Sequence, residues 1–265
     1  KTDVLIGQNS LNINTLGFAM NIAHQKISAS ELHYLPSSHM HPANTRFHFS
    51  FANYYEPTRM GFGALRVFND DDVKPKSGFD RHPHKDMEII SYVVQGKLSH
   101  WDSVTKKEET IGRGHVQAIS AGSGIWHSEM NKQSDWCRLL QIWITPPKRG
   151  GKVRYNHQGF DLKDRENKLL HIVGNPKNKE SSPLYINADV NFYASELTDS
   201  RATVEHELKP GRQAYINCVE GSMHIEGFPA LNERDSLEVT APTNLKFSLK
   251  GEHAHFIIIE MKKSK

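Results

Sequence analysis

No feature of this chain restricts its fold more than a regular succession of short β-rich segments, with almost no convincing helical pattern between them. Residues 89–94 are β-rich and run up to Gly96, and residues 97–101 return as the next strand, which is the pattern of a β-hairpin. Residues 139–144 form another apolar run, which two prolines then stop. Short strands at intervals of roughly ten residues are typical of a barrel or sandwich. We therefore predict an all-β fold.

Three segments early in this series carry expectations of their own. Aromatic side chains alternate with polar ones in residues 47–51, which is the period of a half-buried strand. Residues 61–68 are expected to form the strand after it. Residues 69–72, Asn-Asp-Asp-Asp, look like part of a calcium loop, but the Gly and Glu that such a loop needs at fixed positions are absent. We expect a solvated turn there.

A length of 265 residues is enough for two domains. The Pro- and Gly-rich residues 146–152 are the best linker candidate, and a second series of strand-like segments follows them. Residues 215–222 have the layout of residues 92–97, a strand running into a Gly turn, which suggests a duplicated barrel. We expect an N-terminal extension at 1–42, partly helical over 16–28, a first barrel at 43–160 and a second barrel at 161–265.

The composition excludes several functional classes. The 33 basic and 30 acidic residues are scattered, so the chain shows no electrostatic footprint for direct nucleic-acid binding. No apolar run is long enough to span a bilayer. Cys137 and Cys218 do not resemble a disulfide framework and fit a reducing compartment. We expect a cytoplasmic protein by default, although the chain starts without a Met, which leaves open a targeting signal removed from the natural start.

Two short clusters about 43 positions apart contain residue types that bind metals. His82 and His84 form the first cluster, and His127 and Glu129 form the second. Residues i and i+2 of a strand point to the same face, so each pair can project into a barrel. Three imidazoles and one carboxylate make a mixed N/O ligand set suited to Fe²⁺, Mn²⁺, Ni²⁺, Cu²⁺ or Zn²⁺. The hypothesis is one mononuclear site.

The competing interpretation is chance, because 16 His residues in 265 positions produce some His-x-His pairs by accident. His39 and His41 form such a pair, and its Pro- and Ser-rich surroundings indicate a flexible loop. His253 and His255 form another, but too little chain follows it for a second cluster. Glycines flank the clusters at 82–84 and 127–129, and this context favours a metal site there.

The same residues resemble the two motifs of the cupin superfamily, and we identify His82, His84, Glu88, Gly96, Gly124, His127 and Asn131 as the matching positions. The match departs from the usual pattern at three places. Gly78 lies only four positions before the first His, seven residues separate Glu88 from Gly96, and Gly122 occupies the position of a Pro.

Longer stretches resemble the pirins, a bicupin branch that includes bacterial quercetin 2,3-dioxygenases. The resemblance covers residues 45 to about 160 with high specificity, whereas residues 161–265 match only in pattern and residues 1–40 exceed the usual start of the family. The stretches that carry it are His48-Phe49-Ser50-Phe51-Ala52-Asn53-Tyr54-Tyr55, Met60-Gly61-Phe62-Gly63-Ala64-Leu65-Arg66-Val67, His82-Pro83-His84-Lys85-Asp86-Met87-Glu88, Ser120-Ala121-Gly122-Ser123-Gly124-Ile125-Trp126-His127-Ser128-Glu129 and Gln141-Ile142-Trp143-Ile144.

This resemblance implies two tandem cupin barrels of the jelly-roll, double-stranded β-helix type, the first binding metal and the second metal-free. It implies that His82, His84, His127 and Glu129 are the metal ligands, with Fe²⁺ as the first candidate ion. Glu88 is implied to lie nearby, in a structural or a catalytic role. Gln141 is expected to face the same cavity, and barrel lining is the expectation for Met87, Ile89 and Trp126.

The activity that the resemblance implies is a metal-dependent dioxygenase reaction, in which O₂ opens the central ring of a flavonol such as quercetin and carbon monoxide is released. The metal would act as a Lewis acid, and Glu129 is the candidate base that takes the substrate proton, with Glu88 as a second catalytic candidate. An alternative of another class is a redox-responsive interaction module that contacts transcription regulators without turnover. A phosphosugar isomerase would need a basic cluster near the metal, and only Arg81 and Lys85 qualify.

Overall fold

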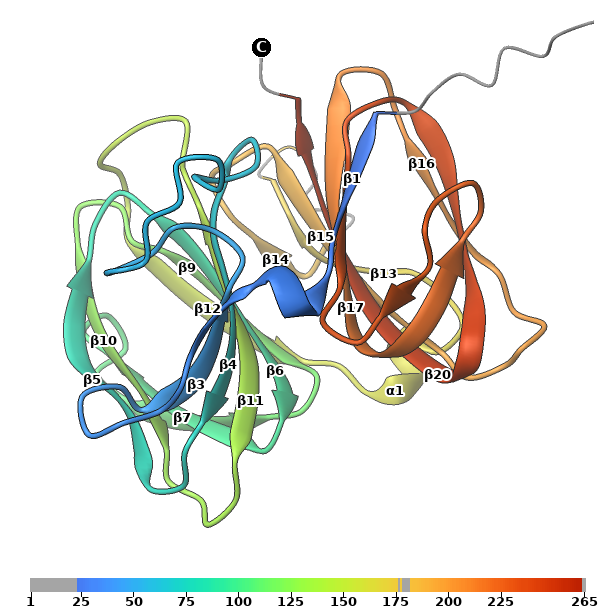
Figure 1. Cartoon of the computed structure of the whole chain (residues 1–265). Helices are drawn as coiled ribbons and strands as arrows, with labels where there is room; N and C mark the ends of the chain where they lie inside the picture. The colour runs from blue at the N-terminus through green and yellow to red at the C-terminus, as the bar shows by residue number, and fades with distance from the viewer. Residues whose placement is uncertain (1–22, 176, 178–181, 264–265) are drawn as a thin grey trace, which may run out of the picture.

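The computed structural model describes residues 23–175, 177 and 182–263, and it consists of two β-barrels packed side by side (Figure 1). The described residues contain only short helical segments, η1 (Ala29–Glu31) and α1 (Leu162–Arg165), so the prediction of an all-β fold is confirmed. Within the described residues, no helix has the length and apolar character needed to cross a membrane.

The first barrel is built from two antiparallel sheets. The described strands of its larger sheet, in spatial order, are β12 (Arg154–Gly159), β9 (His115–Ser120), β6 (Glu88–Gln95), β11 (Cys137–Ile144), β4 (Leu65–Val73), β3 (Ala43–Phe47) and β2 (His33–Leu35). The smaller sheet contains β5 (Ser77–His84), β10 (Ile125–Asn131), β7 (Lys97–Asp102) and β8 (Glu108–Gly112).

The second barrel is one sheet whose two longest strands bend sharply enough to close it. Its described strands are β1 (His24–Ile27), β13 (Leu170–Gly174), β14 (Leu184–Tyr185), β15 (Val190–Leu197), β16 (Val204–Leu208), β17 (Arg212–Ile225), β18 (Leu231–Asn232), β19 (Ser236–Val239) and β20 (Thr243–Lys262). The pairing of β17 with β20 shifts register at two β-bulges. Such bulges bend and twist a strand.

The central strand β6 shows why the two barrels pack together. Its side chains alternate between two buried environments. Tyr92 and its neighbours at 90 and 94 belong to an apolar core shared with Phe192 and Tyr215 of the second barrel. Ile89 and Val93 belong to separate apolar clusters of the first barrel. A strand buried on both faces gives the continuous apolar run seen in the sequence.

A row of polar side chains crosses the inner face of the larger sheet of the first barrel. The register aligns Asn69 of β4 with Gln141 of β11, Gln141 with Ser91 of β6, and Ser91 with Gln117 of β9. Along β6, Ile89 and Val93 flank this row. The inside of the barrel therefore has a polar belt between two apolar layers.

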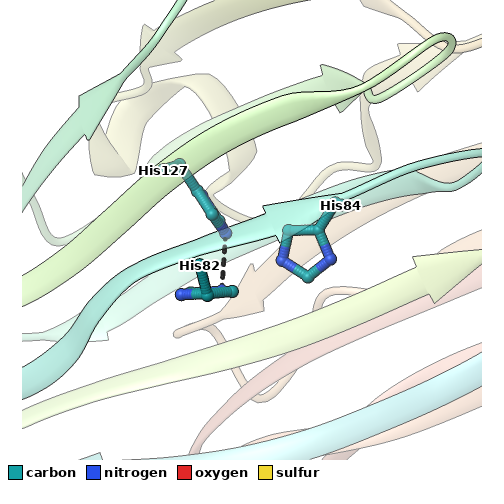
Figure 2. A group of neighbouring side chains, drawn as sticks. All are labelled: His82, His84 and His127. Atoms are coloured by element: carbon teal, nitrogen blue, oxygen red, sulfur yellow. Dashed lines mark hydrogen bonds between the residues drawn. The ribbon is translucent and has the colours of Figure 1, made fainter.

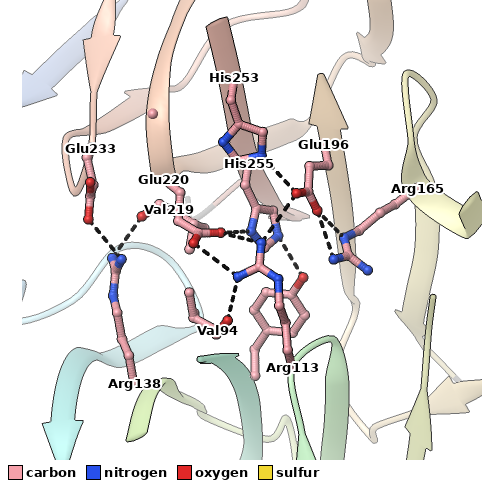
Figure 3. Close-up of polar contacts among 12 residues, drawn as sticks. Val94, Arg113, Arg138, Arg165, Glu196, Val219, Glu220, Glu233, His253 and His255 are labelled. Carbon is pink, nitrogen blue, oxygen red and sulfur yellow. Dashed lines mark hydrogen bonds and ion pairs between the residues drawn. The ribbon is translucent and has the colours of Figure 1, made fainter. Parts of the chain in front are cut away.

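Charged side chains link the barrels around this shared core (Figure 3). Arg113 of the first barrel donates hydrogen bonds to Glu220 at 2.8 and 3.0 Å and lies 3.3 Å from Glu196. His255 of the second barrel lies 2.8 Å from Glu220 through Nδ1 and 2.7 Å from the Tyr92 hydroxyl through Nε2. The contact between the barrels is thus both apolar and strongly hydrogen-bonded.

The structure contradicts several local predictions. Residues 69–72 are not a solvated turn but part of β4, with Asp70 0% and Asp71 3% exposed. Residues 97–101 do not form a hairpin with β6, because Gly96 (φ +79°) passes the chain from one sheet to the other and β7 pairs with β8 and β10. The half-buried strand expected at residues 47–51 is also wrong, since β3 ends at Phe47 and His48, Phe49 and Ser50 are buried.

The N-terminal segment differs from the expectation too. The helix predicted over 16–28 lies partly outside the described residues, and where it is described it is the strand β1, which pairs with β19 of the second barrel. The next strand, β2, pairs with β3 of the first barrel. Residues 24–35 of the expected extension therefore join both barrels.

The linker candidate at 146–152 does not separate the barrels, because β12 follows it and pairs with β9.

Candidate metal centre

The end of β5 and the adjoining part of β10 bring the two predicted clusters together. His127 of β10 pairs directly with His82 of β5, and the register shifts between His127 and Glu129. This irregularity puts both Phe79 and His82 at the same cavity although they are three residues apart. Gly78 allows the close approach of the strands, because a Cβ there would collide with the backbone of residues 129–130.

The imidazoles of His82, His84 and His127 point toward one another (Figure 2). One ring nitrogen from each lies within 4.8 Å of the others, and the Nε2 atoms of His82 and His127 are 3.0 Å apart. Since His nitrogens lie about 2.0–2.1 Å from a bound metal such as Zn²⁺, two nitrogens on one ion are at most about 4 Å apart. The separation between His82 and His127 lies within this limit, and His84 completes the candidate group of ligands.

The protonation states of these rings also suit metal binding. Burial, together with the neighbouring His127 and His82, lowers the pKa of His84 to about 3. Burial likewise lowers the pKa of His127 to about 3, with His82 and His100 adding to the effect. The Nδ1 of His82 lies 2.7 Å from the carbonyl oxygen of Asp80, a contact in which Nδ1 donates and Nε2 keeps its lone pair. Neutral imidazoles with free lone pairs are the ligand form.

Glu129 lies beside this triad with its carboxylate held by the polar belt. Ser91 donates to one carboxylate oxygen at 3.0 Å, and the Nε2 of Gln141 donates to the other at 2.6 Å. Glu129 also forms a second group of metal-ligand atoms with His127 and His100, all within 4.8 Å of one another and all buried. The expectation that Gln141 faces the site is confirmed, since it lines the same cavity as His82 and His84.

Sequence reasoning missed His100. It lies on β7 directly opposite Glu129, stacks on Tyr155 at 4.5 Å, and has its Nε2 3.3 Å from Asp102. No His-x-His pair marks it in the sequence. The signal that could have found it is its place in a predicted strand, residues 97–101, between the two metal clusters. A sheet pairing can bring a His of such a strand next to them.

A cavity of about 210 Å³ opens beside His82 and His84 of the triad. Aromatic and polar side chains line it, namely His41, Thr45, Phe47, Phe51, Asn69, Asp71, Phe79, His82, His84, Glu129, Gln141 and Trp143. The prediction that His41 lies in a loop without a role missed its place at this cavity, where its Nε2 is 2.9 Å from the hydroxyl of Thr45. That hydroxyl in turn donates to Asp71.

Asp71 is an unusual group for a cavity wall. Burial raises its pKa to about 7, and the negative charges of Asp70, Glu129 and Asp72 add to the shift, whereas the hydrogen bond from Thr45 opposes it. The side chain therefore holds a proton near neutral pH. A protonated carboxyl next to an ionised one is the usual outcome when acidic groups crowd a buried site.

Glu88 does not line the cavity beside the His triad. Its carboxylate accepts hydrogen bonds from Ser120 at 2.6 Å and from the backbone and side chain of Asn187 at 3.1 Å, and it lines a different pocket. Of the two roles left open for Glu88, this geometry favours the structural one.

The barrel lining was predicted to include Met87, Ile89 and Trp126. Met87 and Ile89 pack in the apolar layer beside the triad. Trp126 is 53% exposed, so its expected place in the barrel lining is wrong.

Comparison with known proteins identifies the family. The sequence profile of the pirins matches residues 29–144, and a profile described as the quercetinase C-terminal cupin domain matches residues 173–261. The quercetin 2,3-dioxygenase of Escherichia coli K12 is 41% identical over 183 residues, which are 69% of this chain and 76% of that protein. The chain belongs to the pirin family.

Other relatives agree. A pirin-like protein of Caulobacter vibrioides is 38% identical over 190 residues, which are 72% of this pirin and 80% of the relative. The crystal structure of the bacterial pirin YhhW from Escherichia coli in complex with nickel(II) has a TM-score of 0.82 and 30% identity, and the match covers 91% of this pirin and all of that chain. The predictions of a pirin and of two cupin barrels are confirmed, and a divalent metal agrees with the His cluster of this pirin.

Proposed function

We propose that this pirin is an oxidoreductase, a metal-dependent dioxygenase that uses O₂ to open the central ring of flavonols such as quercetin. The observation that carries the proposal is the triad of His side chains, two of which, His82 and His84, line a cavity with aromatic walls. The relative from Escherichia coli bears the name of this activity. Fe²⁺ is the first candidate for the ion, with Mn²⁺, Ni²⁺, Cu²⁺ and Zn²⁺ as the other members of the set.

In this proposal His82, His84, His127 and Glu129 hold the ion. When bound, the ion supplies Lewis-acid stabilisation of negative charge that develops on a substrate oxygen. Glu129 is the proposed base, because its carboxylate lies beside the triad and can take the proton of the flavonol hydroxyl. Ser91 and Gln141 each donate to one of its oxygens and thereby fix its orientation.

The aromatic walls have a separate task. Phe51 and Trp143 meet edge to face at 5.2 Å, and Trp143 meets His84 edge to face at 4.8 Å. These rings give a flat aromatic substrate apolar surfaces to pack on and keep water away from the reacting oxygen. A cavity of about 150 Å³ holds benzene, so a cavity of 210 Å³ accommodates one substituted ring. The rest of a flavonol would extend through the mouth.

Glu88 has a positioning role in this scheme. Its hydrogen bonds with Asn187 connect the start of β6 in the first barrel to a loop of the second barrel.

We also propose a cytoplasmic location. Cys137 and Cys218 are both buried and free, which fits a compartment where thiols stay reduced.

The test is turnover by purified protein loaded in parallel with each of the five metals. Quercetin and O₂ should disappear in equal amounts, with carbon monoxide released, for at least one metal. Absence of turnover with every metal, while elemental analysis shows full loading, would refute the dioxygenase proposal. That result would favour the interaction module, which needs bound metal but no reaction.

A further inference from the structure

Two polar atoms in the wall of the metal cavity are buried without a hydrogen-bond partner. They are the amide oxygen Oδ1 of Asn69 and the indole nitrogen Nε1 of Trp143. Asn69 is only 4% exposed, and both side chains line the cavity. Burying a polar atom without a partner is unfavourable, and such atoms are rare in folded proteins. Because both belong to the wall of the one cavity beside the His triad, they are candidate hydrogen-bonding positions for a ligand there.

The sheet places the two atoms on either side of one fully engaged side chain. Asn69 pairs across the sheet with Gln141, and Trp143 follows Gln141 on the same face of β11. The amide nitrogen of Gln141 donates to Glu129, and its amide oxygen lies 3.1 Å from the Ser91 hydroxyl. Gln141 is thus occupied with Glu129, whereas Oδ1 of Asn69 and Nε1 of Trp143 have no partner within the described residues.

Other polar groups of the wall already have partners. The carboxyl of Asp71 accepts from Thr45, and the hydroxyl of Thr45 contacts His41. Among the described side chains that line the cavity, the buried atoms left unpartnered are hence one acceptor and one donor. A purely apolar ring would leave both without partners. A ring that carries a hydroxyl and a further oxygen would satisfy both.

We propose that Asn69 and Trp143 determine substrate specificity by recognising a hydroxylated aromatic ring in the cavity. Asn69 Oδ1 accepts a hydrogen bond from a phenolic hydroxyl, and Trp143 Nε1–H donates to a second oxygen of the same ligand. The inference rests on the proposed function and deepens it, because it assigns recognition of the substrate's oxygen atoms to these two side chains. Sites built to bond a substrate hydroxyl discriminate strongly against analogues without it.

The test separates binding from reaction. Protein loaded with metal is titrated under argon with quercetin and with flavone, which has the same three-ring frame without hydroxyls. Asn69→Leu and Trp143→Phe each remove one hydrogen bond while keeping an apolar or aromatic surface. Since a neutral hydrogen bond contributes modestly, each substitution should raise the dissociation constant for quercetin by about 2- to 10-fold. Flavone has no hydroxyl to donate to Asn69, so its binding should change much less in Asn69→Leu.

Matched controls come from the same chain. Asn191→Leu replaces an Asn of the second barrel that is 6% exposed and also has an unpartnered Oδ1. Trp126→Phe replaces an exposed Trp that does not line the cavity. Both should bind quercetin like the wild type, and elemental analysis should show equal metal content throughout. If Asn69→Leu fails to fold, Trp143→Phe still decides the question because it keeps an aromatic ring at this position.

The outcomes distinguish this inference from the proposed function. Wild-type turnover with unchanged quercetin affinity in both variants overturns the inference and leaves the dioxygenase proposal standing. Tight anaerobic binding that both variants weaken, without turnover by the wild type, supports the inference and refutes the dioxygenase. Failure of the wild-type protein to bind quercetin at all overturns the inference.

Discussion

Replacing Arg138 should destabilise the protein strongly, because this side chain neutralises a buried carboxylate at the contact between the barrels. Arg138 is 6% exposed and Asp70 is fully buried. The guanidinium binds both carboxylate oxygens of Asp70, at 2.9 and 2.8 Å. It also donates to the carbonyl oxygen of Val219 at 2.8 Å and to Glu233 at 3.0 Å, both in the second barrel (Figure 3).

The expected magnitude follows from these contacts. Removing one partner of a buried ion pair costs about 3–5 kcal/mol. Arg234 lies 3.0 Å from the same carboxylate and compensates in part, so we expect Arg138→Met to lower the free energy of unfolding by about 3 kcal/mol. For a chain of this size, that corresponds to a fall of roughly 6–12 °C in the unfolding temperature.

Scanning calorimetry measures this shift, with Arg201→Met as the control. Arg201 pairs with Asp199 on the surface with 90% of its side chain exposed, and its loss should leave the unfolding temperature unchanged. The double variant Asp70→Leu/Arg138→Met should recover more than half of the lost stability, because no buried charge is left unpaired. An Arg138→Met protein as stable as the wild type, or a double variant less stable than the single one, would contradict the reasoning.

Three further predictions follow from the site and the core. His84→Ala should abolish bound metal, and full metal content by elemental analysis would refute the ligand assignment. The pKa of Asp71 is about 7 in the folded protein against 3.8 for the free group. Its ionisation therefore opposes folding increasingly as the pH rises from about 4 to 7. In denaturant titrations of the metal-free protein, Asp71→Asn should raise the free energy of unfolding by up to about 4 kcal/mol at pH 8 and hardly at pH 4. Tyr92→Phe leaves the Nε2 of buried His255 without its 2.7 Å partner and should cost about 1–3 kcal/mol in the same assay; an unchanged midpoint would show that this contact does not matter.

The elements that sequence predicted best are those whose pattern is local. β6 and β11 are apolar runs ended by Gly96 and by Pro146, and both were predicted nearly to their ends. The metal triad could be predicted because two i, i+2 pairs in glycine-rich surroundings point to one face, and because the motifs resemble a known family.

What sequence could not predict depends on distant partners. Three consecutive acidic residues at 70–72 look solvated until Arg138 and Arg234, far along the chain, are seen to neutralise two of them. His100 joins the site only through the pairing of β7 with β10. His41 reaches the cavity through Thr45 of β3. In each case the deciding contact spans a sheet pairing or a barrel interface, which a pattern of neighbouring residues does not encode.

The pairing of β1 with β19 has a consequence for how the protein is made. His24 pairs with Val239, so the ribosome must add more than 200 residues before β1 can find its partner. At typical rates of synthesis this takes roughly 10–40 s. The strands of the first barrel, and with them the metal triad, are complete by residue 159. β1 therefore remains unpaired while the strands of the first barrel are synthesised, and it can join the structure only after β19 of the second barrel has emerged.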